Sequence, residues 1–118
     1  MRLLACLLIA GLAIVRFEPA FAHAFLERAS PLASSTLQSA PPIVTMTFSV
    51  PIEPRFSVIE VQDGQGNRMD SGPVRMSDGK SIAIDLVTLA AGNHIVNWQA
   101  LPADTHRTRG HFEFSVRP

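Results

Sequence analysis

The chain has 118 residues, of which ten are basic and ten acidic, so its formal net charge at neutral pH is zero. This length allows one compact domain with a modest core and excludes a second domain. The balanced charge excludes a surface built to attract nucleic acid or an anionic membrane.

Residues 1–22 have the pattern of an export signal. A basic residue and thirteen apolar residues are followed by Ala20-Phe21-Ala22, the small-x-small pattern that signal peptidase accepts. We expect cleavage before His23, which leaves 23–118 as one exported domain. The apolar run is too short to span a bilayer as a helix, so no membrane insertion is expected after signal removal. An uncleaved anchor is the alternative, because two charged residues stand close to the cut.

Signal removal also decides the chemistry of the remaining domain. It takes away two of the ten basic residues and one of the ten acidic ones, which leaves eight and nine and a net charge of −1. The only cysteine, Cys6, leaves with the signal. The domain therefore has no disulfide and no thiolate, and any metal site must use nitrogen and oxygen ligands.

The remainder of the chain predicts an all-β fold. It lacks helix-length apolar periodicity, and turn signals recur about every eight to twelve residues, as in a β-sandwich or barrel. A first strand is expected at 24–29, then a loop rich in serine, proline and alanine over 30–42 with one helical turn at 35–38. Alternating apolar residues predict a second strand over 44–48.

The middle of the chain predicts two further strands and two tight turns. A strand over 56–62 ends at 63–67, where two glycines permit a hairpin. The stretch 68–75 is less regular. A second hairpin turn at 77–80 leads into a strand over 82–86, with its large aliphatic residues on one face.

Two long strands, 93–101 and 110–117, complete the predicted fold. Alternation places the following residues toward the core: His94, Val96, Trp98 and Ala100 on the first strand, and Phe112, Phe114 and Val116 on the second. The same alternation turns His111 outward.

Three residues form a candidate metal site. If His23 begins the domain, its free amine and its imidazole can chelate one ion together. Asp104 and His106 lie two apart in the connection between the last two strands, so both can converge on that ion. Alone, this Asp-x-His pair is more typical of a solvated loop. Three nitrogens and one oxygen in a plane favour Cu(II), with Zn(II) as a weaker occupant.

At this point the sequence resembles the CopC-type periplasmic copper-binding domain over essentially all of 23–118. The segments that carry the resemblance are His23-Ala24-Phe25-Leu26, Ser30-Pro31, Val44-Thr45-Met46-Thr47-Phe48-Ser49, Gly92 with Val96-Asn97-Trp98, Ala103-Asp104-Thr105-His106 and Gly110-His111-Phe112-Glu113-Phe114. The resemblance implies an immunoglobulin-like or cupredoxin-like Greek-key β-sandwich that binds one Cu(II) per chain for copper tolerance, homeostasis or delivery. It implies His23, Asp104 and His106 as ligands and Trp98 as a packed neighbour. It also implies a CopD-type inner-membrane partner, and we expect a monomer.

The chain departs from the family pattern near the metal. Many relatives have a glutamate where Val50 stands, so a fifth ligand from that place is not expected. Glu53 is a candidate replacement near the metal, although a solvent-facing role suits it better. No Met-rich Cu(I) site is expected, because Met46 faces inward and Met69 and Met76 are isolated.

The remaining histidines and arginines have two interpretations each. His94 is expected to be buried and hydrogen-bonded rather than a ligand. His111 is either near the metal or simply exposed on its strand. Arg107 and Arg109 either dock an acidic partner or are solvated loop charges.

Two other functions are compatible with the pattern. An N-terminal histidine that holds copper on a β-sandwich is also the active centre of lytic polysaccharide monooxygenases. This chain has no tyrosine, one tryptophan and mostly short loops, and it lacks a G-x-S-x-G motif for acyl transfer, so we do not expect an enzyme. The other alternative is an exported immunoglobulin-like interaction module without a metal.

Overall fold

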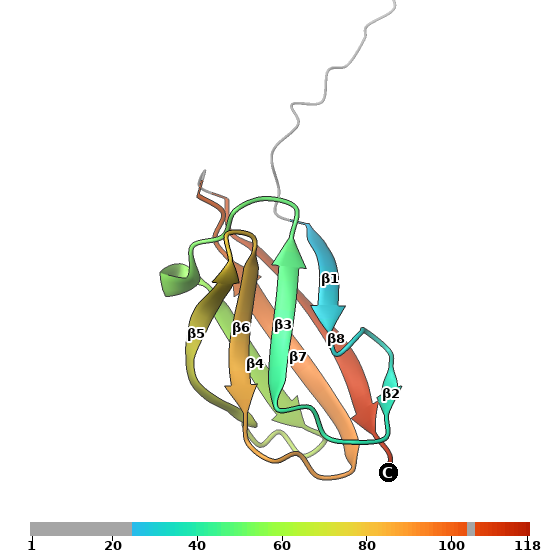
Figure 1. Cartoon of the computed structure of the whole chain (residues 1–118). Helices are drawn as coiled ribbons and strands as arrows, with labels where there is room; N and C mark the ends of the chain where they lie inside the picture. Colours follow the sequence, from blue (N-terminus) through green and yellow to red (C-terminus); the bar gives the residue numbers. More distant parts are fainter. Residues whose placement is uncertain (1–24, 104–105) are drawn as a thin grey trace, which may run out of the picture.

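A computed structural model describes residues 25–103 and 106–118 (Figure 1). The expected signal, His23 and Asp104 therefore lie outside the described residues. The strands are β1 (Leu26–Ser30), β2 (Thr36–Leu37), β3 (Ile43–Phe48), β4 (Val58–Asp63), β5 (Asp70–Asp78), β6 (Ser81–Leu86), β7 (Gly92–Ala100) and β8 (Thr108–Val116), with a short 3-10 helix η1 (Pro54–Phe56). No helix in this part of the chain is long and apolar enough to cross a bilayer.

The strands form two packed sheets. One has the order β1-β3-β6-β5 and the other the order β2-β8-β7-β4. All pairs are antiparallel except β2 with β8. The chain crosses from one sheet to the other at every connection except those between β5 and β6 and between β7 and β8, as in Greek-key sandwiches. The predicted all-β sandwich is confirmed.

The core lies between the sheets, where the alternating apolar residues of both meet. The expected inward residues of β3, β7 and β8 are all buried: Val44, Met46, Phe48, His94, Val96, Trp98, Ala100, Phe112, Phe114 and Val116. On β6 both faces are covered, because Ser81 and Ala83 are buried along with Ile82 and Ile84. Period-2 alternation was therefore a reliable guide to the buried residues of β3, β7 and β8 and incomplete on β6.

The helical turn expected at 35–38 is wrong. The backbone there extends as β2 and runs parallel to β8, with Leu37 opposite Val116. The carbonyl of Ser35 accepts the N–H of Ser115 at 2.9 Å, and that of Leu37 accepts the N–H of Arg117 at 2.8 Å. The segment is extended because its carbonyls accept backbone N–H groups on the edge of β8. Such a tertiary contact cannot be predicted from the local sequence.

The turn at 63–67 is present, but it does not close a hairpin between strands of one sheet. Gly66 has a φ of +84° there, and an antiparallel bridge joins Gln62 to Arg68 just before β5, whereas β4 and β5 themselves belong to different sheets. The irregular stretch predicted after it is strand β5, which pairs with β6 through two register shifts. The turn before β6 is a hairpin, as predicted, with Asp78 opposite Ser81.

Candidate metal centre

The connection between β7 and β8, which carries the Asp-x-His pair, lies at the end of the sandwich where β1 begins (Figure 1). Strands β3 and β7 both run toward this end, and β1, β4 and β8 start from it. The fold therefore brings the start of the described chain and the candidate loop to one end of the molecule, as the copper hypothesis requires.

The N-terminal side of this loop is held by the segment that follows β3. The N–H of Glu53 donates to the carbonyl of Leu101 at 2.9 Å, and Ile52 forms a bridge with Pro102. Ile52 and Pro102 are both almost completely buried. The chain thus enters the loop from a fixed position, and this anchoring was not predicted from the sequence.

The C-terminal side of the loop is held by β8. His106 is exposed, and Thr108 is paired with Ala100 in the last rung of the β7–β8 ladder. The guanidinium of Arg107 donates to the side-chain oxygen of Gln99 at 3.2 Å. His106 is therefore an exposed residue two positions before a firmly paired strand end.

Phe25 fixes the start of the chain beside β3. Its N–H donates to the Ser49 hydroxyl at 3.0 Å, and its carbonyl accepts the Ser49 N–H at 2.9 Å. His23 precedes this anchored residue by two positions. Ser49 was part of the motif that carried the resemblance, but its anchoring role was not foreseen.

Trp98 is buried between the two sheets, and its expected role as a neighbour of the metal stays a prediction. Its ring meets Phe48 of the opposite sheet edge-on, with centroids 5.2 Å apart and planes at 67°. It also lies against Gly110 on β8, where an added Cβ would stand 2.6 Å from Cζ2 of the indole. A glycine inside a strand often marks such a close approach, so Gly110 was detectable from the sequence.

The two candidate neighbours of the metal differ in position. Glu53 is exposed, and its backbone contacts Leu101 at the entrance of the loop. His111 lies opposite Asn97 on β8 and faces outward, away from the core, as the alternation predicted. Val50, at the position of the family glutamate, is half-buried and packs against the core.

His94 is buried, and its Nε2 lies 3.0 Å from the carbonyl oxygen of Ala90. Its ring lies 5.4 Å from that of Phe114. The expected buried, hydrogen-bonded histidine is confirmed, and it sits near the start of β7, at the opposite end of this strand from the candidate loop. Met46 is fully buried in the core, Met69 packs against the core and Met76 is exposed.

Within residues 25–103 and 106–118, no three histidine, aspartate or glutamate side chains lie close enough together to hold a metal ion. The predicted copper site uses donors from the loop and from the N-terminus. The donor types of His23, Asp104 and His106 are imidazole, amine and carboxylate, which suit Cu(II). Of these residues only His106 falls within the described part, so the donor set as a whole stays a hypothesis.

Comparison with known proteins identifies the fold family. The CopC domain model matches residues 26–117. The crystal structure of CopC from Methylosinus trichosporium OB3b superimposes with a TM-score of 0.73 at 30% identity, over 81% of this chain and 95% of that one. PcoC, described as a methionine-rich copper resistance protein from Escherichia coli, gives a TM-score of 0.71 at 29% identity, over 81% of this chain and all of that one.

Two relatives match by sequence. Protein YobA of Escherichia coli (strain K12) is 30% identical over 100 residues, which cover 82% of this chain and 81% of YobA. The copper transport protein CutJ of Bacillus subtilis (strain 168) is 31% identical over 102 residues, which cover 84% of this chain and 19% of CutJ. In CutJ, the matching region is therefore one part of a much longer protein.

Proposed function

The chain belongs to the CopC family, and from this premise we propose that it is a periplasmic copper-binding protein that serves copper tolerance, homeostasis or delivery. The observation that carries the proposal is the loop between β7 and β8, which presents His106 at the end of the sandwich where the N-terminal strand begins. Copper is the cargo of such a protein rather than a cofactor of catalysis.

We propose one Cu(II) per chain, bound by the amine and imidazole of His23, the carboxylate of Asp104 and the imidazole of His106. The amine has an ordinary pKa of about 7.7 to 8.0, so it loses its proton to a metal near neutral pH at small cost. The bonds between Phe25 and Ser49 support this arrangement, because they hold the chain two residues after His23 at the correct end.

The role of the domain in the cell follows from its relatives. PcoC is named as a copper resistance protein and CutJ as a copper transport protein. We propose that this chain passes copper to or from a CopD-type transporter in the inner membrane and acts as a monomer. A rigid sandwich with its ligands at one exposed end suits transfer between proteins.

The decisive experiment combines intact mass with Cu(II) electron paramagnetic resonance after one equivalent of copper. We expect a mass that begins at His23 and an axial spectrum with nitrogen couplings. His106→Ala, or one alanine added before His23, should weaken Cu(II) binding by more than about 100-fold, beyond the usual effect of a residue that only supports a ligand. A mature chain that begins elsewhere, or unchanged affinity in both variants, would refute the ligand set.

A second measurement tests the expected absence of catalysis. The copper-loaded protein is incubated with ascorbate and peroxide on chitin and on cellulose. A carrier should release no oxidised sugars above the level produced by free copper at the same concentration. Release well above that level would instead support the oxidative enzyme.

A further inference from the structure

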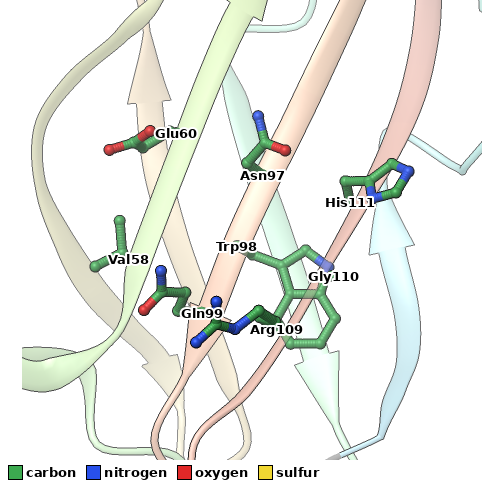
Figure 2. Close-up of a pocket in the computed structure, with 8 residues that line it drawn as sticks. All are labelled: Val58, Glu60, Asn97, Trp98, Gln99, Arg109, Gly110 and His111. Carbon is green, nitrogen blue, oxygen red and sulfur yellow. The ribbon is translucent and has the colours of Figure 1, made fainter.

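A pocket lies on the outer face of the sheet formed by β4, β7 and β8 (Figure 2). Its volume is about 270 Å³. Its outward side chains lie in two rows across the three strands, and these are Val58, Gln99 and Arg109 in one row and Glu60, Asn97 and His111 in the other. We call this feature the β4–β7–β8 pocket.

The charge around the β4–β7–β8 pocket is positive on the side nearest the loop. Arg107 precedes β8 and Arg109 lies on it, and both are exposed. In the described part of the chain, neither arginine has a carboxylate within ion-pair distance. Glu60, the one carboxylate that lines the pocket, is already bound by the guanidinium of Arg68 at 3.3 Å.

The size and lining of the pocket limit what it can bind. Its volume falls below the range of about 300–1,000 Å³ that is typical of sites for free small molecules, so it fits an inserted side chain better. The amide of Gln99 and the guanidinium of Arg109 offer hydrogen-bond donors, and Val58, 38% exposed, adds an apolar wall. A carboxylate side chain on a short aliphatic stem matches this combination.

The position of the pocket links it to copper. Gln99 and Arg109 form the rung next to Ala100 and Thr108, and the candidate loop leaves the sheet from that last rung. A partner seated on this rung would lie a few residues from His106.

We propose that the β4–β7–β8 pocket docks an acidic segment of the protein with which this chain exchanges copper, with one Glu or Asp carboxylate held by Arg109 and Arg107. This inference rests on the proposed function, because the docked partner is defined as the protein that exchanges copper with this chain. The contact is electrostatic and exposed, so it raises the encounter rate and orients the partner rather than forming a permanent complex.

The test titrates 15N-labelled protein with blocked hexaglutamate, and with blocked hexaglutamine as the neutral control. We expect hexaglutamate alone to shift the amides of residues 97–99 and 107–111. Arg109→Glu should weaken this binding about tenfold or more. Arg117→Glu, which makes the same charge change just beyond the far end of β8, is the matched control and should change binding less than about twofold.

Three results would overturn the proposal. These are shifts concentrated outside this face, equal losses in the Arg109 and Arg117 variants, and equal binding of hexaglutamine. Cu(II) spectra of the same samples separate this inference from the proposed function. If the native and Arg109→Glu proteins give the same Cu(II) spectrum but hexaglutamate does not bind the native protein, only the docking site is refuted. If the native protein gives no Cu(II) spectrum, the proposed copper function is refuted independently of the docking site.

Discussion

The indole of Trp98 occupies the space that a side chain at Gly110 would fill. The two residues are paired across β7 and β8, and a Cβ on Gly110 would stand 2.6 Å from Cζ2 and 2.8 Å from Cε2 of the ring. On its other side Trp98 meets Phe48 of the opposite sheet. The absent side chain thus allows one ring to contact both sheets, two rungs from the last pair of the β7–β8 ladder.

Gly110→Ala is expected to destabilise the fold. The methyl group meets a ring that is itself wedged against Phe48, so neither can move freely, and overpacking of this kind costs about 1–3 kcal/mol. Thermal unfolding should show a midpoint lower by about 4–8 °C for each kcal/mol lost. Gly79→Ala is the control, since a Cβ there meets nothing within 4 Å. Equal midpoints for the two variants would contradict the packing argument.

Asp70 links the two sheets by a charged hydrogen-bond network. Its Oδ1 accepts the backbone N–H of Val61 at 2.9 Å, and both its oxygens accept donors of Arg68 at 2.8 Å. The hydrogen bonds from Arg68, followed by that from Val61, lower the pKa of Asp70 below its ordinary 3.8, against the opposing effect of burial. This stabilisation is therefore complete above about pH 4 and is lost as pH falls through the lowered folded-state pKa.

Asp70→Asn is accordingly expected to cost about 1–3 kcal/mol of unfolding free energy at pH 7, and less as the pH falls below 4. Urea unfolding at pH 7 and pH 3 measures the difference. Asp85→Asn serves as the control, because its ion pair with Arg75 is exposed on both sides and should contribute under about 1 kcal/mol. A cost for Asp70→Asn that is the same at both pH values would show that the charge is not the cause.

Much of the fold was predictable because buried residues alternate with half-buried or exposed ones over most of β7 and over the second half of β8. Burial on one face of a strand must appear in the sequence as a period of two, and His94 through Ala100 show it. The segment at 35–38 was misjudged because its conformation depends on partners far away in the sequence, Ser115 and Arg117. The turn at 63–67 was predicted correctly, since local bonds to Asp63 hold it, but the sequence did not show that β4 and β5 belong to different sheets.

The candidate site was predictable only in its donor types. The spacing of Asp104 and His106 indicates a possible pair of ligands, whereas nothing in the sequence indicates which residues hold the loop in place. Ile52 and Glu53 hold its entrance through backbone bonds and burial, which any side chain of similar shape could provide. Such contacts leave no pattern in a single sequence, because the backbone groups that make them are the same in every residue.

His111 is expected to contribute little to copper affinity. It faces outward on β8 and lies three residues beyond Thr108, roughly 10 Å along the strand from the start of the ladder. His111→Ala should change the Cu(II) dissociation constant less than about threefold, against more than about 100-fold for His106→Ala. Competition with a chelator of known affinity measures both. Comparable losses in the two variants would place His111 at the metal and refute this assignment.

His94→Phe is expected to leave stability unchanged or to raise it by up to about 1 kcal/mol. Nδ1 of His94 is buried and has no hydrogen-bond partner among residues 25–103 and 106–118, and the replacement removes that unsatisfied atom while keeping a ring beside Phe114. The lost bond to Ala90 matters less, because Ala90 is exposed and its carbonyl can turn to water. His94→Ala, by contrast, leaves a cavity and should cost about 2–4 kcal/mol. Urea unfolding measures the free energy of unfolding of both variants. An equal loss of stability in His94→Phe and His94→Ala would contradict this prediction, because it would mean that Nδ1 makes a favourable contact in the native protein that a phenyl ring cannot make.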